Sequence, residues 1–170
     1  DATGLRFGIV ASKFNKFVTS RLLAECVKAL TKAGAKEEDL EVVRVPGAFE
    51  IPIVARQLAR SGRFDAVICL GAVIRGDTPH FEFIAAEASR GIMQASLDTS
   101  VPVVFGVLTT DTVAQAIERA DPAKMNRGAE AARTAIEMAN VMRLLVKEGV
   151  GEEPAPPAAG RRRPAARHKR

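Results

Sequence analysis

The run Asp65-Ala66-Val67-Ile68-Cys69-Leu70 is almost entirely apolar. A strand with one face in water alternates apolar and polar residues, so this run predicts a strand that is buried on both faces. A loop follows the run, and an apolar pattern with helical period then extends from about Pro79 to Leu97. A buried strand followed by a helix is the repeating unit of a parallel α/β sheet.

The same succession of strand and helix occurs four times along the chain. Strands are predicted at residues 5–11, 40–45, 65–70 and 103–108, and helices at 18–33, 51–59, 79–97, 111–119 and 127–147. Successive units of this kind imply parallel strands with helices on both faces. We therefore expect an α/β fold over residues 1–149, a three-layer α/β/α sandwich with a four-stranded parallel sheet. Residues 150–170 form a Pro/Ala/Arg-rich basic tail that we expect to be disordered.

The net charge of +5 and the pI near 9.6 suggest a polyanionic partner for the 170-residue chain. However, six of the 25 basic and two of the 20 acidic residues lie in the tail, so residues 1–149 hold 19 basic and 18 acidic groups. The tail could contact the phosphates of nucleic acid. A solvated extension without a partner is the interpretation that we favour, and nucleic acid is not an expected partner.

Several other classes of protein do not fit the sequence. No run of about 18 apolar residues is present and no signal peptide is visible, so we expect no membrane partner and a cytoplasmic protein. Location in an organelle is the alternative, should a transit peptide have preceded Asp1. Cys26 and Cys69 lie in apolar runs, which predicts buried free thiols in a reducing compartment. One of the two histidines lies in the tail, so a multi-histidine metal site is not expected.

Familiar nucleotide-binding motifs are missing from the sequence. No GxGxxG occurs, which leaves a dinucleotide site without support. Gly71 to Gly76 gives GxxxxG after a strand, but Asp77 stands where a phosphate-binding loop needs lysine. A carboxylate at that place would repel the phosphates, which excludes this class of site.

Unusual residues follow the predicted strands at their carboxyl ends, where open α/β sheets bind ligands. The four segments are Ser12-Lys13-Phe14-Asn15, Pro46-Gly47-Ala48-Phe49-Glu50, Gly71 to His80, and Gly106 to Thr110. Because the strands are expected to be parallel, these segments should meet at one edge of the sheet. The sequence therefore predicts the ligand site at this edge.

The segment after the third strand suits an anion. Thr78 is a good cap for the following helix, Pro79 fits its first position, and free backbone N–H groups would point outward. Gly76 lets the backbone approach a ligand closely. The positive helix end would keep His80 neutral, as a proton acceptor. Simple capping or packing of the His80 ring is the alternative interpretation.

Single residues elsewhere each have two interpretations. Phe14 and Phe49 can stack on a planar ligand or belong to the core. Glu50 lies between apolar neighbours and needs a polar partner, such as a ligand hydroxyl. Arg119 and Arg127, near the last helix junction, can bind phosphate or remain solvated.

Four motifs keep a characteristic spacing: Phe14-Asn15, Pro46-Gly47-Ala48-Phe49-Glu50-Ile51-Pro52, Gly71 to Phe81, and Ala135-Ile136-Glu137-Met138-Ala139-Asn140. Together they resemble the 6,7-dimethyl-8-ribityllumazine synthase family, from about Leu5 to Leu145, and the run from Ile74 to Phe81 is the most specific part. The resemblance implies a flavodoxin-like sheet and no metal or organic cofactor. It implies a transferase that condenses 5-amino-6-(D-ribitylamino)uracil with 3,4-dihydroxy-2-butanone 4-phosphate, the penultimate step of riboflavin biosynthesis.

The resemblance also implies roles for single residues. Phe14 should stack on the pyrimidine ring, and the other contacts to the ring and the ribityl chain should come from Asn15, Ala48, Phe49, Glu50, Val73, Ile74 and Phe105. Phosphate should be bound by Asp77, Thr78, Arg119 and Arg127, the last of which stands where the family usually has lysine. His80 should transfer protons, oriented by Glu130.

The family forms pentamers, some of which assemble into sixty-subunit icosahedral shells, with sites between adjacent subunits. By this resemblance we expect a homo-oligomer with two small-molecule substrates, and riboflavin synthase is a further suggested partner. A shell or ligand-binding protein that has lost catalysis and retains flavin or lumazine is the alternative. The intact His80, Arg119 and Glu50 favour the enzyme.

Overall fold

The computed structural model describes residues 1–151. Four parallel strands form one sheet in the order β2-β1-β3-β4. The strands are β1 (Phe7–Ser12), β2 (Leu40–Val45), β3 (Ala66–Ile74) and β4 (Val103–Thr110). The α-helices of this part of the chain are α1 (Lys16–Lys32), α2 (Ile51–Arg60), α3 (His80–Thr99), α4 (Val113–Ala120) and α5 (Arg127–Lys147). Short 3-10 helices lie at Glu37–Asp39 and Ala48–Glu50.

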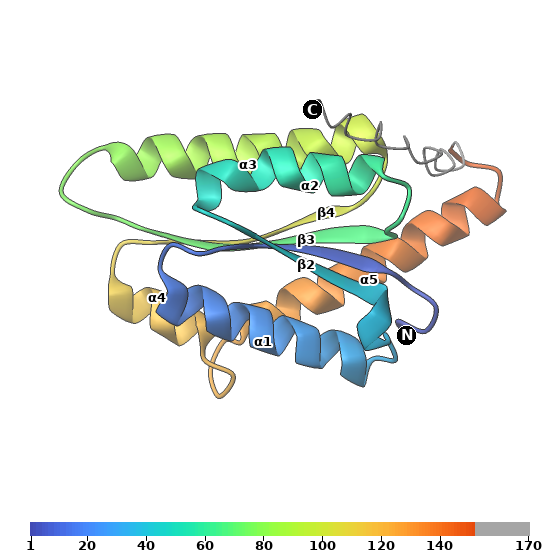
Figure 1. Ribbon diagram of the computed structural model, residues 1–170, viewed down its shortest axis with the longest axis horizontal. Helices are drawn as coiled ribbons and strands as arrows, with labels where there is room; N and C mark the ends of the chain where they lie inside the picture. Colours follow the sequence, from blue (N-terminus) through green and yellow to red (C-terminus); the bar gives the residue numbers. More distant parts are fainter. Residues whose placement is uncertain (152–170) are drawn as a thin grey trace, which may run out of the picture.

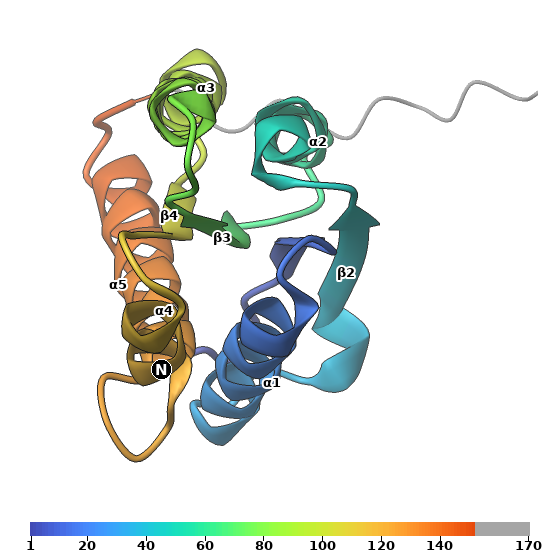
Figure 2. The ribbon, with the colours of Figure 1, turned by 90° about the vertical axis from the view of Figure 1, so that its left-hand side faces the viewer.

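The sheet lies between two layers of helices (Figure 1). α2 and α3 cover one face, and α1, α4 and α5 cover the other, as the end-on view in Figure 2 shows. The predicted α/β/α sandwich with a four-stranded parallel, flavodoxin-like sheet is confirmed. Residues 152–170 of the predicted tail lie outside the described residues, so the disorder and the domain boundary stay predictions.

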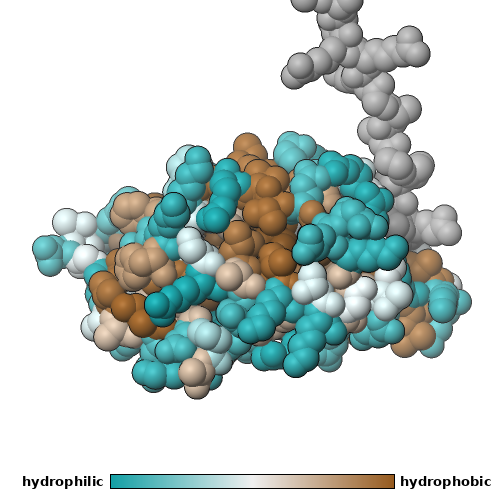
Figure 3. All heavy atoms as spheres, turned by 60° about the horizontal axis from the view of Figure 1, so that its bottom comes forward, coloured by the Kyte–Doolittle hydropathy of each residue, from teal (hydrophilic) through white to brown (hydrophobic). Residues whose placement is uncertain are grey.

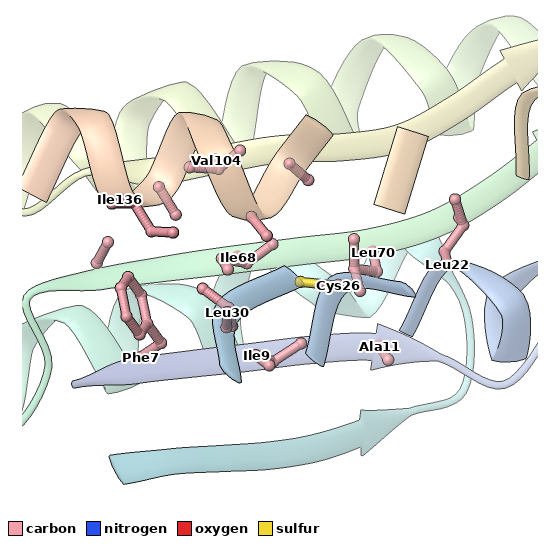
Figure 4. Close-up of a cluster of buried hydrophobic side chains, with 14 of the residues drawn as sticks. Phe7, Ile9, Ala11, Leu22, Cys26, Leu30, Ile68, Leu70, Val104 and Ile136 are labelled. Atoms are coloured by element: carbon pink, nitrogen blue, oxygen red, sulfur yellow. The ribbon is translucent and has the colours of Figure 1, made fainter. Parts of the chain in front are cut away.

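Two apolar cores lie on opposite faces of the sheet, because the side chains of a strand alternate between its faces. Phe7 and Ile9 of β1 point into the core beneath α1, α4 and α5, whereas Val10 points into the core beneath α2 and α3. Figure 4 shows the first of these cores, with Cys26 of α1 among its members. β3 is buried along almost its whole length, which explains its continuous apolar sequence. Cys26 and Cys69 are buried free thiols, as predicted.

Two strands are longer than predicted. β3 continues to Ile74 and β4 to Thr110, whereas ends at residues 70 and 108 were expected. The small residues after Leu70 suggested a loop, but parallel pairing continues until Ile74 lies opposite Thr110. Gly71 belongs to the strand for a packing reason, since a Cβ there would meet the Ile51 side chain at 3.1 Å. The loop that leads to α3 therefore begins only at residue 75.

The N-terminal caps of two helices also differ from the prediction. α3 begins at His80, one residue later than expected, and no side chain caps it, so the predicted capping role of Thr78 is wrong. Thr112, and not Asp111, caps α4, because its hydroxyl accepts the Gln115 N–H at 3.1 Å. The Gln115 side chain in turn accepts the Thr112 N–H at 3.3 Å, the reciprocal arrangement of a capping box.

Close helix packing depends on glycine at two places. α1 and α5 approach so closely that a Cβ on Gly128 would overlap the backbone carbonyl of Leu22. In the other helix layer, a Cβ on Gly91 of α3 would lie 2.7 Å from the Pro52 ring of α2. No helix within residues 1–151 is long and apolar enough to cross a membrane.

Candidate functional site

Loops from three strands meet at the carboxyl edge of the sheet, the edge that faces the viewer in Figure 2. The Phe14 N–H donates to the Pro46 carbonyl at 3.0 Å, which joins the loop after β1 to the loop after β2. Asn15 Nδ2 donates to the Ala72 carbonyl at 2.9 Å, which joins the β1 loop to β3. The predicted convergence of these segments at one edge is confirmed.

Ten predicted site residues belong to the end of β3, to the segments that follow β1, β2 and β3, and to the first residue of α3. We call them the strand-end cluster: Phe14, Asn15, Ala48, Phe49, Glu50, Val73, Ile74, Asp77, Thr78 and His80. Their roles toward a ligand remain predictions.

The loop after β1 exposes an aromatic ring because of the backbone at Asn15. Asn15 has φ 57° and ψ 47°, the left-handed conformation that asparagine tolerates better than most residues. The chain turns there from β1 into α1, and Phe14 remains 70% exposed. Phe49, after β2, is 55% exposed. The core alternative is therefore wrong for both residues, and two apolar rings are available to a ligand or a partner.

Glu50 has a polar partner within its own loop. Its Oε2 accepts the Gly47 N–H at 2.9 Å, across the short 3-10 helix Ala48–Glu50. The predicted need for a polar partner is thus met within the chain at one carboxylate oxygen. The consequence is that the carboxylate is oriented before any ligand binds.

The start of α3 carries exposed polar residues. Asp77, Thr78 and His80 are all exposed, and no side chain among the described residues caps the helix. The partial positive charge of a helix N-terminus favours an anion. The predicted anion site is therefore compatible with the structure of this turn.

A second group of predicted site residues lines a cavity of about 560 Å³ along β4, the strand at one edge of the sheet. Phe105 belongs to β4, Arg119 to the last turn of α4, and Arg127 and Glu130 to the first turn of α5. We call these four residues the edge cluster. Arg119 Nη1 donates to the Gln115 carbonyl at 3.2 Å, and Arg127 forms an ion pair with Glu130.

Known proteins resemble this chain over both clusters. The sequence pattern of the 6,7-dimethyl-8-ribityllumazine synthase family matches residues 4–143. A curated 6,7-dimethyl-8-ribityllumazine synthase of Syntrophus aciditrophicus (strain SB) is 61% identical over 144 residues, which are 85% of this chain and 94% of that protein. This chain belongs to the lumazine synthase family.

The two clusters of this lumazine synthase family member do not merge into one site within a single chain. His80 is not among the residues that line the β4 cavity, and the Glu130 carboxylate pairs with Arg127. The expected orientation of His80 by Glu130 therefore stays a prediction. One chain presents one aromatic-rich surface and one separate arginine-rich cavity.

Arg75 lies inside the lumazine synthase motif from Ile74 to Phe81 and has no predicted role of its own. Its Nε donates to Asp111 Oδ1 at 2.8 Å, its Nη1 pairs with Glu82, and its guanidinium carbon lies 4.4 Å from the centre of the Phe81 ring. The hydrogen bond from Arg75 lowers the pKa of the Glu82 carboxyl, and the bonds to Asp111 and Glu82 raise the pKa of Arg75. Glu82 lies in α3 and Asp111 in the connection between β4 and α4, so no sequence spacing predicts these partners of Arg75.

Proposed function

We propose that this chain condenses 5-amino-6-(D-ribitylamino)uracil with 3,4-dihydroxy-2-butanone 4-phosphate. The products are 6,7-dimethyl-8-ribityllumazine, phosphate and water, and the reaction is the penultimate step of riboflavin biosynthesis. The observation that carries the proposal is the 61% identity to a curated lumazine synthase over 94% of its length. The strand-end cluster supports it, because an exposed aromatic ring, an oriented carboxylate and an uncapped helix start occur at one edge.

The strand-end cluster suits a flat polar ring that carries a polyhydroxylated chain. The exposed Phe14 ring offers a face for stacking. Glu50, held by Gly47, and Asn15, held by Ala72, are oriented in advance, which lowers the entropy cost of binding the ribityl hydroxyls. The remaining ring contacts in this proposal come from Ala48, Phe49, Val73 and Ile74.

His80 is the proton-transfer residue of the proposed reaction. The uracil amine attacks the ketone carbonyl, loss of water gives a Schiff base, elimination releases phosphate, and ring closure expels a second water. Each of these steps moves a proton, and a neutral imidazole accepts and returns protons near pH 7. The N-terminus of α3 lies beside His80 and stabilises the charge of the leaving phosphate. Glu130 orients the imidazole.

The phosphate group in this proposal is held by residues of both clusters. Asp77 and Thr78 belong to the strand-end cluster and contribute backbone N–H groups rather than the Asp77 carboxylate, whereas Arg119 and Arg127 belong to the edge cluster. Arginine binds phosphate oxygens in a planar, bidentate manner, which suits this role. We infer that the edge cluster of one subunit faces the strand-end cluster of its neighbour, so that each site is shared.

The proposed assembly is a homopentamer, with a sixty-subunit shell as its larger form. Phe83, Met93 and Leu97 of α3 are each more than 60% exposed. Apolar side chains also gather among hydrophilic residues in Figure 3, a view in which the α1 and α4 side of the molecule comes forward. Exposed apolar surface of this kind supports subunit contacts. The intact particle mass distinguishes an assembly of five subunits from one of sixty, and a monomer mass would contradict the shared site.

The proposal also includes riboflavin synthase as a partner and a cytoplasmic location.

Turnover by the purified chain tests the proposed reaction. Both substrates together should give a product with the absorption band of a lumazine, and failure to form it would overturn the proposal. His80→Ala should lower kcat by about 100-fold or more without changing the particle mass. His168→Ala, the corresponding change at the other histidine, is the matched control and should leave kcat unchanged.

A further inference from the structure

Arg75 connects three elements at the carboxyl edge of the sheet. Its backbone N–H donates to the Thr110 carbonyl at 2.8 Å and so extends the pairing of β3 with β4. Its side chain bonds to Asp111, in the connection between β4 and α4, at 2.8 Å. The same guanidinium pairs with Glu82 and covers the Phe81 ring, both in the first turn of α3.

The start of α3 is attached to the rest of the fold by few polar contacts. Phe81 packs against the core beneath α2 and α3. No side chain among residues 1–151 caps this helix, residues 75–80 are all exposed, and a Cβ on Gly76 would meet no atom within 4 Å. The contacts of Arg75 with Glu82 and Phe81 therefore add a direct side-chain link from the end of β3 to the first turn of α3.

We propose that Arg75 is a positioning residue: by joining the β4–α4 connection to the first turn of α3, it fixes His80 and the backbone N–H groups of that turn. This inference rests on the proposed function of the same site. Arg75 does not need to touch a substrate in this role. It acts on the phosphate-bearing substrate and on proton transfer through α3, whereas the pyrimidine contacts at Phe14 and Glu50 depend on other loops.

The shape of arginine matters for this role. A planar guanidinium can donate to two carboxylates and stack on a ring at the same time, whereas the lysine ammonium is a compact charge on a flexible stem. An exposed ion pair alone contributes little to stability. The expected effect of Arg75 is therefore on geometry, and lysine should not replace it.

The chain contains a matched control in Arg63. Its guanidinium pairs with Glu41 and lies 4.9 Å from the centre of the Phe64 ring, so it makes the same kinds of contact as Arg75. Both arginines are partly exposed to a similar degree. Arg63 precedes β3, however, and so lies at the end of the sheet opposite the strand-end cluster.

The test compares Arg75→Met, Arg75→Lys and Arg63→Met as full-length assembled proteins, with kcat and both KM values measured. Arg75→Met should lower kcat about tenfold and raise KM for the phosphate-bearing substrate about fivefold, because displacement of reacting groups by a fraction of an ångström costs this much. KM for the pyrimidine should change less than about twofold, Arg75→Lys should behave like Arg75→Met, and Arg63→Met should match the parent. Equal losses in Arg75→Met and Arg63→Met, or full activity in Arg75→Met, would overturn the inference.

Hydrogen exchange of the amides of residues 82–86, in the first hydrogen-bonded turns of α3, keeps the test independent of turnover. Arg75→Met should speed their exchange about tenfold, and Arg63→Met should not, because local opening depends on the contacts that hold a segment. Unchanged exchange in Arg75→Met would overturn the positioning role even in an active enzyme. A parent protein that forms no lumazine but shows this exchange pattern would overturn the proposed function and leave the role of Arg75 in holding α3 intact.

Discussion

Asn15 combines a backbone and a side-chain task at the carboxyl end of β1. It adopts the left-handed conformation, and its amide donates to the Ala72 carbonyl. Phe14 and Phe49 show why this matters for prediction from sequence. A phenylalanine after a strand fits a core or a ligand site equally well, and the turn at Asn15 decides that Phe14 is exposed.

Replacement of Asn15 tests this double role. Asn15→Ala should destabilise the fold by about 2 kcal/mol, because alanine is strained by about 1 kcal/mol in the left-handed region and the hydrogen bond contributes about 1 kcal/mol. Asn15→Gly removes the bond without the strain, and should cost about 1 kcal/mol. Urea unfolding measures both values. Equal losses in the two variants would show that the backbone conformation contributes nothing.

The two thiols are expected to be inert in the folded protein. Burial raises the pKa of the Cys26 thiol to about 12 and raises the pKa of the Cys69 thiol as well. The thiolate is the reactive form, so a thiol reagent at pH 8 should label neither residue before unfolding and both after it, counted by mass spectrometry. Labelling of either thiol in the native state would contradict the burial.

The raised pKa values of the two thiols have a consequence for the stability of the fold. The unfolded chain loses its thiol protons near pH 9, while the folded chain retains them. The stability contribution is therefore complete below pH 9 and declines as the pH rises from 9 toward 12. Cys26→Ala should weaken this decline, which urea unfolding at pH 8 and pH 10 measures.

At the scale of elements, the contact between α1 and α5 depends on Gly128. A Cβ at this position would overlap the Leu22 carbonyl, which is backbone and cannot move aside as a side chain can. Alanine favours the helix by about 1 kcal/mol over glycine. The overlap should cost more, so we expect Gly128→Ala to destabilise the protein by about 2 kcal/mol net.

Gly76→Ala is the matched control for that prediction. A Cβ at Gly76 would meet no atom within 4 Å, and its φ lies outside the left-handed region. The unfolding free energy of Gly76→Ala should stay within about 0.5 kcal/mol of that of the parent protein. If Gly128→Ala were as stable as Gly76→Ala, α1 and α5 would not be held in the close contact described.

The order and type of the elements follow from the sequence, whereas their ends do not. The helices have a clear apolar period and β3 a continuous apolar run, and every predicted α-helix and β-strand is present. The sequence predicts an end of β3 at residue 70, four residues before its end in the structure. Gly71 and Ala72 resemble a loop by residue type, and only their pairing with β4 shows that they belong to the strand. The sequence predicts Asp111 as the cap of α4, but Thr112 caps it instead. The Asp111 carboxylate pairs with Arg75, a partner that no local pattern contains.

At the scale of the molecule, the two clusters allow a test by complementation. His80→Ala and Arg119→Ala subunits should each assemble into an inactive particle. When the two chains are mixed before assembly, about a quarter of the contacts in a ring should pair an intact strand-end cluster with an intact edge cluster. Activity should therefore return to about a quarter of the parent value. No recovery would show that one chain supplies both residues to the same site.

The edge cluster also marks the limit of prediction from one sequence. Phe105 and Glu130 are assigned by resemblance alone, whereas Arg119 and Arg127 are also candidates from their place near the last helix junction, and the structure gathers all four around one cavity. The contacts proposed between this cavity and a neighbouring subunit are not encoded by any spacing within the chain. The place of the strand-end cluster can be predicted from the parallel direction of the strands alone, because parallel strands bring their carboxyl ends together.

The division of the proposed site residues over two surfaces of one chain has a genetic consequence. In the proposed assembly, a chain that folds and assembles but carries defects in both clusters would spoil the sites that it shares with two neighbours. Such an allele would lower the output of a cell that also holds a normal copy by more than the simple absence of one copy would. An unstable allele, such as one that substitutes Gly128, would drop out of the assembly and behave as recessive.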